Sequence, residues 1–349
     1  MSMTNTYMQR VAARTPTRFW INNPTGAELE LAVRSGALSG TTNPTYSANL
    51  LKREPAYINP ILDEVVSQVP DDEEAADLVY QRVSKRFMQA FMPRYKKSGG
   101  RQGFVTMQDD PRRDHRAELI VHAALRHAEV SPNYMAKIPV IASGMEAMAE
   151  LIRRNMPICA TECFSISQTI AMCDLYEKVS AECGHRPPFF ITHITGIFDE
   201  EQEDRVRRDG ISIDPEVLKQ AGCIVGRKEY RVLKERGYHT VLLGGGARGI
   251  HHFTEFVGGE VHITMNWSTI QEMIDADPAV EIRIDDEASP AVLEELNAKL
   301  PDFRRAYADD GLAVEAFDEF PPLLRFRRNF VDGCDCVLEA IRSKRAAGN

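Results

Sequence analysis

The sequence has no apolar run of about 18 residues and no apolar stretch of signal-peptide length near its amino terminus, so neither a transmembrane helix nor a secretory signal is expected. It also lacks a surplus of basic residues: 42 Lys and Arg stand against 51 Asp and Glu, for a net charge of −9. Because a basic face usually meets a phosphodiester partner, this argues against nucleic-acid binding. We predict a cytoplasmic protein that has neither a nucleic acid nor a membrane as partner.

Cofactor and metal signatures are missing as well. No Gly-rich dinucleotide fingerprint follows the first predicted strand, which runs into NNPTGAEL instead. The His and Cys residues lack the spacing of a metal site, and we interpret Cys334-Asp335-Cys336 as a helix surface feature. The seven cysteines are odd in number and mostly sit in apolar patterns, which is typical of a reducing compartment. The sequence therefore predicts no cofactor, no metal and no disulfide.

The chain does have enough apolar residues for a large core. Of its 349 residues, 43% are hydrophobic and 27% are charged, close to the averages of soluble domains. Short segments rich in Val, Ile, Thr and aromatic residues, each ending in Gly, Pro or polar residues, predict eight strands. These segments are residues 19–23, 40–44, 103–108, 134–140, 158–163, 189–194, 240–245 and 261–265.

Segments with helical periodicity lie between the strands, for example at 25–38, 114–130 and 165–184. Alternating strands and helices imply a parallel sheet, and eight such units favour a closed (β/α)8 (TIM) barrel over an open doubly wound sheet. Residues 45–102 predict a helical insertion after the second strand. We expect one domain over 1–349, with a barrel core at about 18–275 and a C-terminal helical extension at 276–349 that packs on the barrel.

One lysine stands out in the predicted barrel. Lys137 lies between apolar neighbours in YMAKIPV, where a charged ammonium is costly unless it is paired or deprotonated. A desolvated lysine has a depressed pKa and can attack a carbonyl carbon to form a Schiff base. The alternative is a lysine that reaches from the strand end into solvent.

Further segments resemble the transaldolase family in the same order along the chain, over roughly residues 18–275. They are GTTNPTYS, GFVTMQDDP, NYMAKIPV, GMEAMAELI, ATECFSISQTIAMC and GYHTVLLGGGARGI. The resemblance implies a metal-free (β/α)8 barrel that cleaves ketoses through a lysine Schiff base and passes dihydroxyacetone to an aldehyde. Lys137 matches the family's lysine.

The chain departs from the family at the two carboxylates that transfer protons. Asn22 takes the place of the aspartate on the first strand, and Gln108 takes that of the glutamate on the third. An amide orients water or a hydroxyl but does not act as a general base near neutrality. Thr161 matches a threonine that helps to hold the catalytic water.

The missing proton carrier has several candidates, none of which the pattern selects: Glu162, Asp109, His193 and Tyr46. Strict strand alternation turns Glu162 outward, so we expect it to form a salt bridge to a flanking helix. His193 has the same parity problem, and we expect a structural role for it.

The resemblance also implies substrate contacts. Thr41 and Asn43 match residues that hydrogen-bond the dihydroxyacetone unit, although turn chemistry alone would also explain them. Thr192 stands where the family has an active-site serine. For phosphate, the chain keeps Arg248, but Gly246 replaces a serine and Ile197 replaces a second arginine.

Taken together, these residues predict a class I transaldolase-like enzyme of carbohydrate metabolism, as in the pentose phosphate pathway. It would transfer a dihydroxyacetone unit between a ketose, phosphorylated or not, and an aldehyde. One alternative is a non-transferring aldolase of the fructose-6-phosphate aldolase type on a non-standard sugar or keto acid. Another is a catalytically weak sugar-binding barrel. The expected partner is a small sugar or sugar phosphate, and a homo-oligomer is possible.

Overall fold

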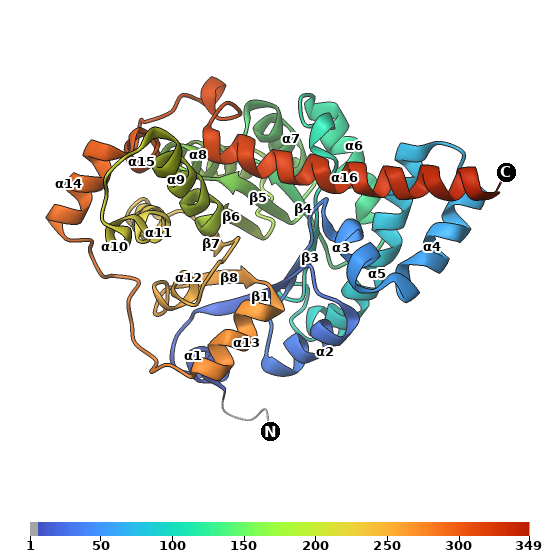
Figure 1. The fold of residues 1–349 in the computed structure, drawn as a ribbon, viewed down its shortest axis with the longest axis horizontal. Helices are drawn as coiled ribbons and strands as arrows, with labels where there is room; N and C mark the ends of the chain where they lie inside the picture. The colour runs from blue at the N-terminus through green and yellow to red at the C-terminus, as the bar shows by residue number, and fades with distance from the viewer. Residues whose placement is uncertain (1–5, 349) are drawn as a thin grey trace.

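Eight parallel strands close into a barrel in the computed structural model, which describes residues 6–348. Each strand pairs with its neighbours in chain order, and β1 pairs with β8 to complete the ring (Figure 1). The predicted (β/α)8 fold is therefore confirmed. The strands are β1 Arg18–Asn22, β2 Gly40–Thr41, β3 Val105–Met107, β4 Tyr134–Pro139, β5 Ile158–Cys163, β6 Phe189–His193, β7 Val241–Gly244 and β8 Val261–Met265.

Helices surround the barrel and connect its strands (Figure 1). Those from the amino terminus to β5 are α1 Tyr7–Arg14, α2 Gly26–Ser35, α3 Tyr46–Arg53, α4 Pro55–Gln68, α5 Asp72–Lys97, α6 Ala117–Ala128 and α7 Ala142–Arg153, with the 3-10 turn η1 Pro111–Arg113. The remaining ones are α8 Ile166–Cys183, α9 Thr195–Asp209, α10 Pro215–Leu218, α11 Ala221–Glu235, α12 His251–Thr254, α13 Trp267–Ala276, α14 Pro290–Lys299, α15 Pro301–Tyr307, η2 Val314–Ala316 and α16 Pro321–Gly348.

Local sequence sets the ends of the helices. Thr25 caps the first turn of α2 in a reciprocal capping box with Glu28, and Gly36 ends the helix with a left-handed φ of 98°. Ser165 caps α8 by accepting a hydrogen bond from the Gln168 backbone N–H. These caps place the turn before each helix, and therefore the strand end that leads into it.

The lower barrel interior is filled with apolar side chains: Trp20, Leu38, Phe104, Met135, Cys159, Phe190 and Leu243. Trp20 is fully buried, and its Nε1 donates a 3.0 Å hydrogen bond to Nδ1 of His262. Burial lowers the pKa of His262 to about 3, so the ring remains a neutral acceptor. Met135 precedes Lys137 by two residues on β4, so this apolar layer forms the floor beneath the lysine.

The insertion after β2 folds into α3, α4 and α5, which pack on one another at one side of the barrel. Helix α5 lies very close to the barrel wall. A Cβ added at Gly40 of β2 would come within 2.1 Å of the Phe87 ring of α5, so only glycine allows this approach. The insertion also supplies part of the surface against which the C-terminal helix packs.

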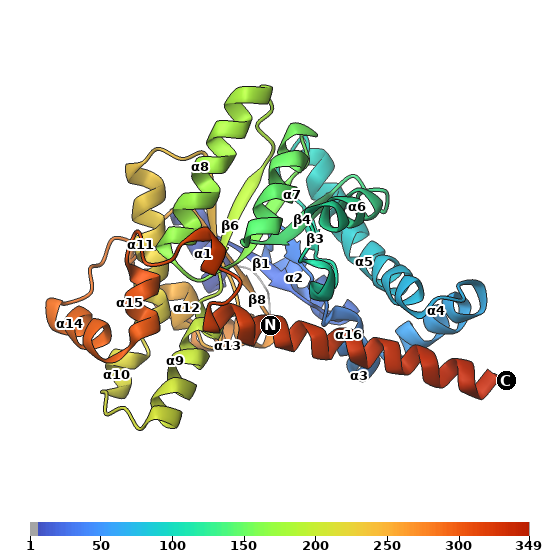
Figure 2. The same ribbon diagram turned by 90° about the horizontal axis from the view of Figure 1, so that it is seen from above.

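Helix α16 is the main feature of the C-terminal extension. Figures 1 and 2 show it as a long rod that crosses the barrel and extends beyond it alongside α4. It packs against α3, α5 and α9 and also reaches β5. Near its end, Arg345 forms an ion pair with Asp72 of α5 at 2.8 Å. The prediction that the extension packs on the barrel is confirmed.

The charged stretch 198–210 is only partly exposed to solvent. It lies in α9, whose first turns are buried, including Phe198, Asp199 and Gln202. Helices α16 and α11 pack against α9 and cover this end. The charged side chains at this end therefore form bonds within the protein and do not make up a solvated face.

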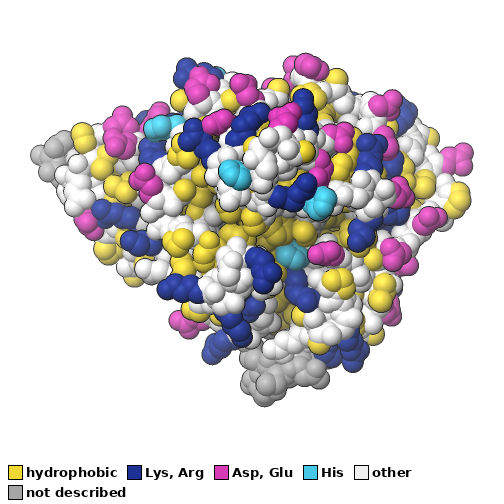
Figure 3. All heavy atoms as spheres, turned by 180° about the vertical axis from the view of Figure 1, so that it is seen from behind, with side chains coloured by type: hydrophobic (Ala, Val, Ile, Leu, Met, Phe, Trp, Pro, Cys, Tyr) yellow, Lys and Arg dark blue, Asp and Glu magenta, His cyan; other side chains and the backbone are white. Residues whose placement is uncertain are grey.

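On the face shown in Figure 3, hydrophobic side chains gather in a central hollow, and basic and acidic side chains alternate around it. No helix among residues 6–348 is long and apolar enough to cross a membrane. All seven cysteines carry free thiols.

Candidate active site

A cavity of about 200 Å³ opens at the carboxyl ends of the barrel strands, and Lys137 of β4 lines it. Amide and hydroxyl side chains make up most of its wall: Asn22, Asn23, Asn43, Asn49, Asn266, Asn329, Thr41, Thr45, Thr192 and Thr264. Among the described residues, no Asp or Glu lines it. Such neutral donors and acceptors suit a ligand with several hydroxyl groups.

Lys137 is held in a dry environment, with only 7% of its surface exposed. Burial lowers its pKa, while the nearby Cys159 and Glu162 act in the opposite direction. Its Nζ lies 5.6 Å from the centre of the Phe330 ring on α16. A larger fraction of the Lys137 amine is therefore neutral and nucleophilic than for a lysine in water. This placement contradicts the alternative of a lysine reaching into solvent.

A chain of hydrogen bonds links the side chains on β1, β2 and β8. The Thr41 hydroxyl donates to Asn22 Oδ1 at 2.8 Å and lies 2.6 Å from the Thr264 hydroxyl. Asn22 Nδ2 in turn donates to Asn266 Oδ1 at 2.9 Å. The chain fixes the orientation of the Asn22 amide, so Asn22 and Thr41 form one polar wall of the cavity.

Asn43 serves the turn after β2 and also faces the cavity. Its Oδ1 accepts hydrogen bonds from Asn23 Nδ2 at 3.1 Å, the Thr45 backbone N–H at 3.0 Å and the Thr45 hydroxyl at 2.7 Å. Because the turn occupies Oδ1, the Nδ2 amino group of Asn43 is the part left to donate to a ligand. Turn chemistry and a place at the cavity are thus both present at this residue.

The end of β5 departs from regular strand geometry. Ala160 pairs with Ile191 of β6 and Cys163 with His193, so β5 has one more residue than its partner over this stretch. Glu162 sits in this bulge with a φ of 57°. The bulge shifts the alternation, and the Cys163 thiol points outward to Thr169 of α8, 3.1 Å away.

Glu162 is therefore not the outward residue that strict alternation predicts, and the expected salt bridge to a flanking helix is wrong. The side chain is fully buried, and Oε1 accepts a 2.7 Å hydrogen bond from Gln108 Nε2 after β3. Gln168 of α8 stabilises the bulge by donating a 3.0 Å hydrogen bond to the Glu162 carbonyl oxygen. The contact between Glu162 and Gln108 spans β4, the strand that carries Lys137.

Gln108 and Thr161 are buried but do not line the cavity itself. No hydrogen bond from residues 6–348 reaches Gln108 Oε1, Thr161 Oγ1 or Glu162 Oε2. Unpaired buried polar atoms are uncommon because each one loses its hydration without compensation. Three of them near a buried amine indicate a place where a small polar group can be bound.

Helix α16 forms the roof of the cavity through Phe326, Asn329 and Phe330. Their spacing of i, i+3 and i+4 places them on one helix face. From the same helix, the Arg327 guanidinium lowers the pKa of both Glu162 and Asp114, although burial raises both overall. The sequence analysis missed these residues. The spacing of these aromatic and Asn residues predicts that they share one helix face. It does not predict which surface that face covers.

The Gly-rich turn after β7 brings Arg248 and Gly246 to the rim of the cavity, beside Ile194 and Ile197. Gly246 has a φ of 65°, a conformation that suits glycine. Arg248 is exposed, and its Nε donates a 2.6 Å hydrogen bond to Glu200 of α9. A bound anion would therefore share this guanidinium with Glu200.

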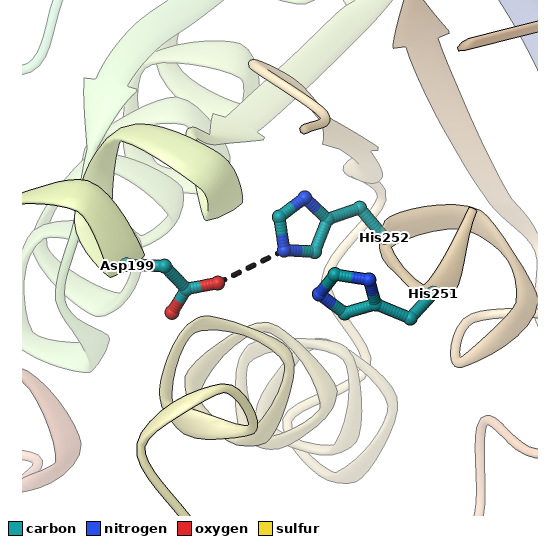
Figure 4. A group of neighbouring side chains, drawn as sticks. All are labelled: Asp199, His251 and His252. Atoms are coloured by element: carbon teal, nitrogen blue, oxygen red, sulfur yellow. Dashed lines mark hydrogen bonds and ion pairs between the residues drawn. The ribbon is translucent and has the colours of Figure 1, made fainter. Parts of the chain in front are cut away.

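His252 braces this turn (Figure 4). Its Nδ1 accepts a 3.0 Å hydrogen bond from the Arg248 backbone N–H, so its Nε2 carries the proton and donates to Asp199 at 2.9 Å. Asp199 and His252 lie with His251 close enough to share a metal ion. However, a protonated Nε2 cannot ligate a metal, so the bonding favours a brace. A second such group is Asp77, Asp109 and His127, and there His127 pairs with Asp77 at 2.6 Å.

The other candidate proton carriers lie away from the cavity. His193 is fully buried outside the barrel wall, bonded to Glu229 at 3.1 Å and to the Gly222 carbonyl at 3.0 Å, as expected of a structural residue. The Tyr46 hydroxyl donates to the Pro24 carbonyl at 3.1 Å. Asp109 faces Arg113 at 3.3 Å, beneath α16.

The fold and the cavity define a class of protein: a (β/α)8 barrel whose buried lysine meets a polar, sugar-compatible pocket at the carboxyl ends of the strands. The family model for transaldolase/fructose-6-phosphate aldolase matches residues 20–319. The chain belongs to this family.

Curated relatives are distant. A transaldolase of Mycobacterium ulcerans is 24% identical over 238 residues, which cover 60% of this chain and 61% of the relative. Transaldolase 1 of Streptomyces avermitilis is 28% identical over 227 residues, covering 62% and 57%. A transaldolase of Mycobacterium tuberculosis is 24% identical over 219 residues, covering 59% and 57%. The chain thus aligns with about three fifths of the length of these relatives.

Proposed function

We propose that this protein is a class I aldol enzyme of carbohydrate metabolism that acts through a Schiff base on Lys137. The observation that carries the proposal is the desolvated amine of Lys137 in a cavity walled by amides and hydroxyls. Family membership supports the same class of chemistry. We place this activity in the cytoplasm, as expected for sugar metabolism.

In the proposed reaction, the neutral Lys137 amine attacks the ketone carbon of a ketose, and loss of water leaves a protonated imine. The imine accepts the electron pair when the C3–C4 bond breaks, and the C4 hydroxyl gives its proton to a water molecule as its C=O bond forms. An aldehyde therefore departs, and a dihydroxyacetone enamine stays on the lysine. Thr41, Asn43 and Asn22 hold the hydroxyls of this unit, and Thr192 lines the same wall. Thr161 and Gln108 orient water through Oγ1 and Oε1, which have no hydrogen-bond partner among the described residues.

The enamine can meet either of two fates. Transfer to a second aldehyde would make the protein a transaldolase-like transferase, the reaction we favour because the relatives bear that name. Protonation and release of free dihydroxyacetone would make it an aldolase of the fructose-6-phosphate aldolase type. Product analysis with and without an added aldehyde acceptor distinguishes the two.

Borohydride trapping tests the central step. When the protein is incubated with a panel of ketoses and reduced with borohydride, we expect a stable adduct on Lys137, identified by peptide mass spectrometry. A sugar-binding barrel without turnover, the alternative raised by the amides Asn22 and Gln108, would bind a ketose reversibly and give no adduct. Absence of an adduct with every ketose and keto acid in the panel would exclude the proposal.

Arg248 is expected to select for an anionic tail. Arg248→Gln should raise KM for a phosphorylated ketose by about 10- to 100-fold, the value of one charge-assisted hydrogen bond, and leave kcat nearly unchanged. The same substitution should leave KM for the unphosphorylated ketose unaltered. Steady-state kinetics with the matched pair of ketoses checks this.

Glu200→Gln provides the control for Arg248, because it frees the guanidinium from its ion pair. We expect it to lower KM for the phosphorylated ketose. Equal effects of Arg248→Gln on both ketoses would contradict the assignment.

A further inference from the structure

We propose that Glu162 is the proton donor for imine formation at Lys137, acting through a water molecule bound beside its carboxyl group, and that β5 thereby replaces the carboxylate missing from β3. This inference rests on the function proposed above and extends it to a residue for which the family resemblance implies no role. It follows from the bulge in β5, the burial of Glu162 and the bonds around its carboxyl group.

The geometry places the Glu162 carboxyl group directly beside the position where the resemblance implies an acid. Gln108 stands where the resemblance places a glutamate, and its Nε2 donates to Glu162 Oε1 at 2.7 Å. The carboxyl group is therefore displaced from that position by one hydrogen bond. Glu162 Oε2 accepts no hydrogen bond from the described residues and is free to exchange a proton.

The bulge explains why Glu162 can reach this place. In a regular strand, residue 162 would point toward the surrounding helices. The extra residue in β5 and the left-handed backbone at Glu162 turn it toward Gln108. Gln168 secures the turn by donating to the carbonyl oxygens of Glu162 and Val140, both at 3.0 Å. Strained backbone that is held by a buried amide in this way is frequent at functional sites.

Charged and titratable groups on three other segments interact electrostatically with Glu162. Lys137 lies on β4, Arg327 on α16 and Asp114 in the segment after η1. Burial raises the pKa of Glu162, and Arg327, the Gln108 hydrogen bond and Lys137 oppose that rise. A carboxyl group with a raised pKa keeps its proton closer to neutral pH, as a general acid must.

The proton balance is as follows. Lys137 adds to the ketone carbon, and a proton moves from its nitrogen to the former carbonyl oxygen to give a neutral carbinolamine. Glu162 does not line the cavity, so its proton reaches the carbinolamine oxygen through the bound water molecule. The C–O bond then breaks, water leaves, and the nitrogen lone pair forms the C=N bond. The products are an iminium on Lys137 and a carboxylate on Glu162, which attract each other. Hydrolysis of the imine returns the proton to Glu162.

An exchange across the Gln108–Glu162 hydrogen bond tests the proposal. The rate of imine formation with dihydroxyacetone is measured by rapid quench into borohydride, with the Lys137 adduct quantified by mass spectrometry. We expect Glu162→Gln to slow adduct formation by ~10²-fold, the usual contribution of one general acid, and to remove the alkaline decline of the rate. The double variant Gln108→Glu/Glu162→Gln keeps one amide and one carboxyl group in contact, and should recover the rate to within about tenfold of wild type.

Asp114→Asn is the matched control, since it removes a second buried carboxyl group that interacts with Glu162 and Arg327. It should leave the rate within about threefold of wild type, well short of the effect of a lost general acid. If Glu162→Gln formed the adduct as fast as wild type, the role of Glu162 would be overturned, but the Schiff base on Lys137 would still be supported. The role of Glu162 would also be overturned if the double variant formed the adduct as slowly as Glu162→Gln. By contrast, no adduct in wild type would remove the proposed function itself.

Discussion

Lys137→Met is expected to lower kcat/KM for ketose cleavage by ~10⁴-fold or more, because a thioether cannot form the imine that accepts the electrons of the C3–C4 bond. The same variant should fold at least as stably as wild type. The lysine is 7% exposed, and an apolar side chain of similar length removes the cost of burying an amine there. The measurements are steady-state kinetics with the best ketose of the panel and a urea titration of the two proteins.

Lys299→Met is a suitable control, because it makes the same chemical change at an exposed lysine of α14, which pairs with Glu295. Its kinetics should match wild type. If Lys137→Met kept more than about a tenth of the activity, a covalent role for the lysine would be untenable, since loss of a nucleophile costs orders of magnitude.

The second large effect concerns the floor of the barrel. Trp20→Ala should lower the free energy of unfolding by about 3–5 kcal/mol, because it opens a cavity in a closed ring of strands that can collapse only partly. Trp20 is fully buried, and its ring lies 4.9 Å from that of Phe190 in an edge-on contact. Urea unfolding followed by circular dichroism gives the change.

Trp20→Phe separates packing from hydrogen bonding at the same position. It keeps most of the aromatic volume but loses the donor to His262, so we expect a loss of about 1–3 kcal/mol. A change below about 1 kcal/mol for Trp20→Ala would show that the layer of side chains beneath Lys137 does not carry the expected stability, given the usual cost of such cavities.

The expected effects at Lys137 depend on α16 as well as on the barrel. Phe330 lies over the Lys137 amine, and Phe326 and Asn329 complete the roof of the cavity. Arg345 and Asp72 anchor the far end of the helix to α5, in the insertion after β2. Two segments outside the alternating strand–helix pattern thus enclose a site built by the barrel.

Strand positions could be predicted from the sequence because each strand has a short apolar run with a clear end. All eight predicted strands exist, and the observed ends differ from the prediction by three residues at most, at β2. Of the expected site residues, Lys137, Asn22, Thr41, Asn43, Thr192, Gly246 and Arg248 line one cavity. Their common location follows from their place at strand ends, since parallel strands bring these ends to one side of a barrel.

The sequence by itself determined the barrel, the buried lysine and the polar residues at the strand ends, because these depend on local periodicity and on the order of segments. Only the tertiary structure decided the direction of Glu162 and the surface that α16 covers. A single inserted residue reverses the facing of a strand end without changing its composition, and a helix face carries no mark of what it meets until the chain has folded.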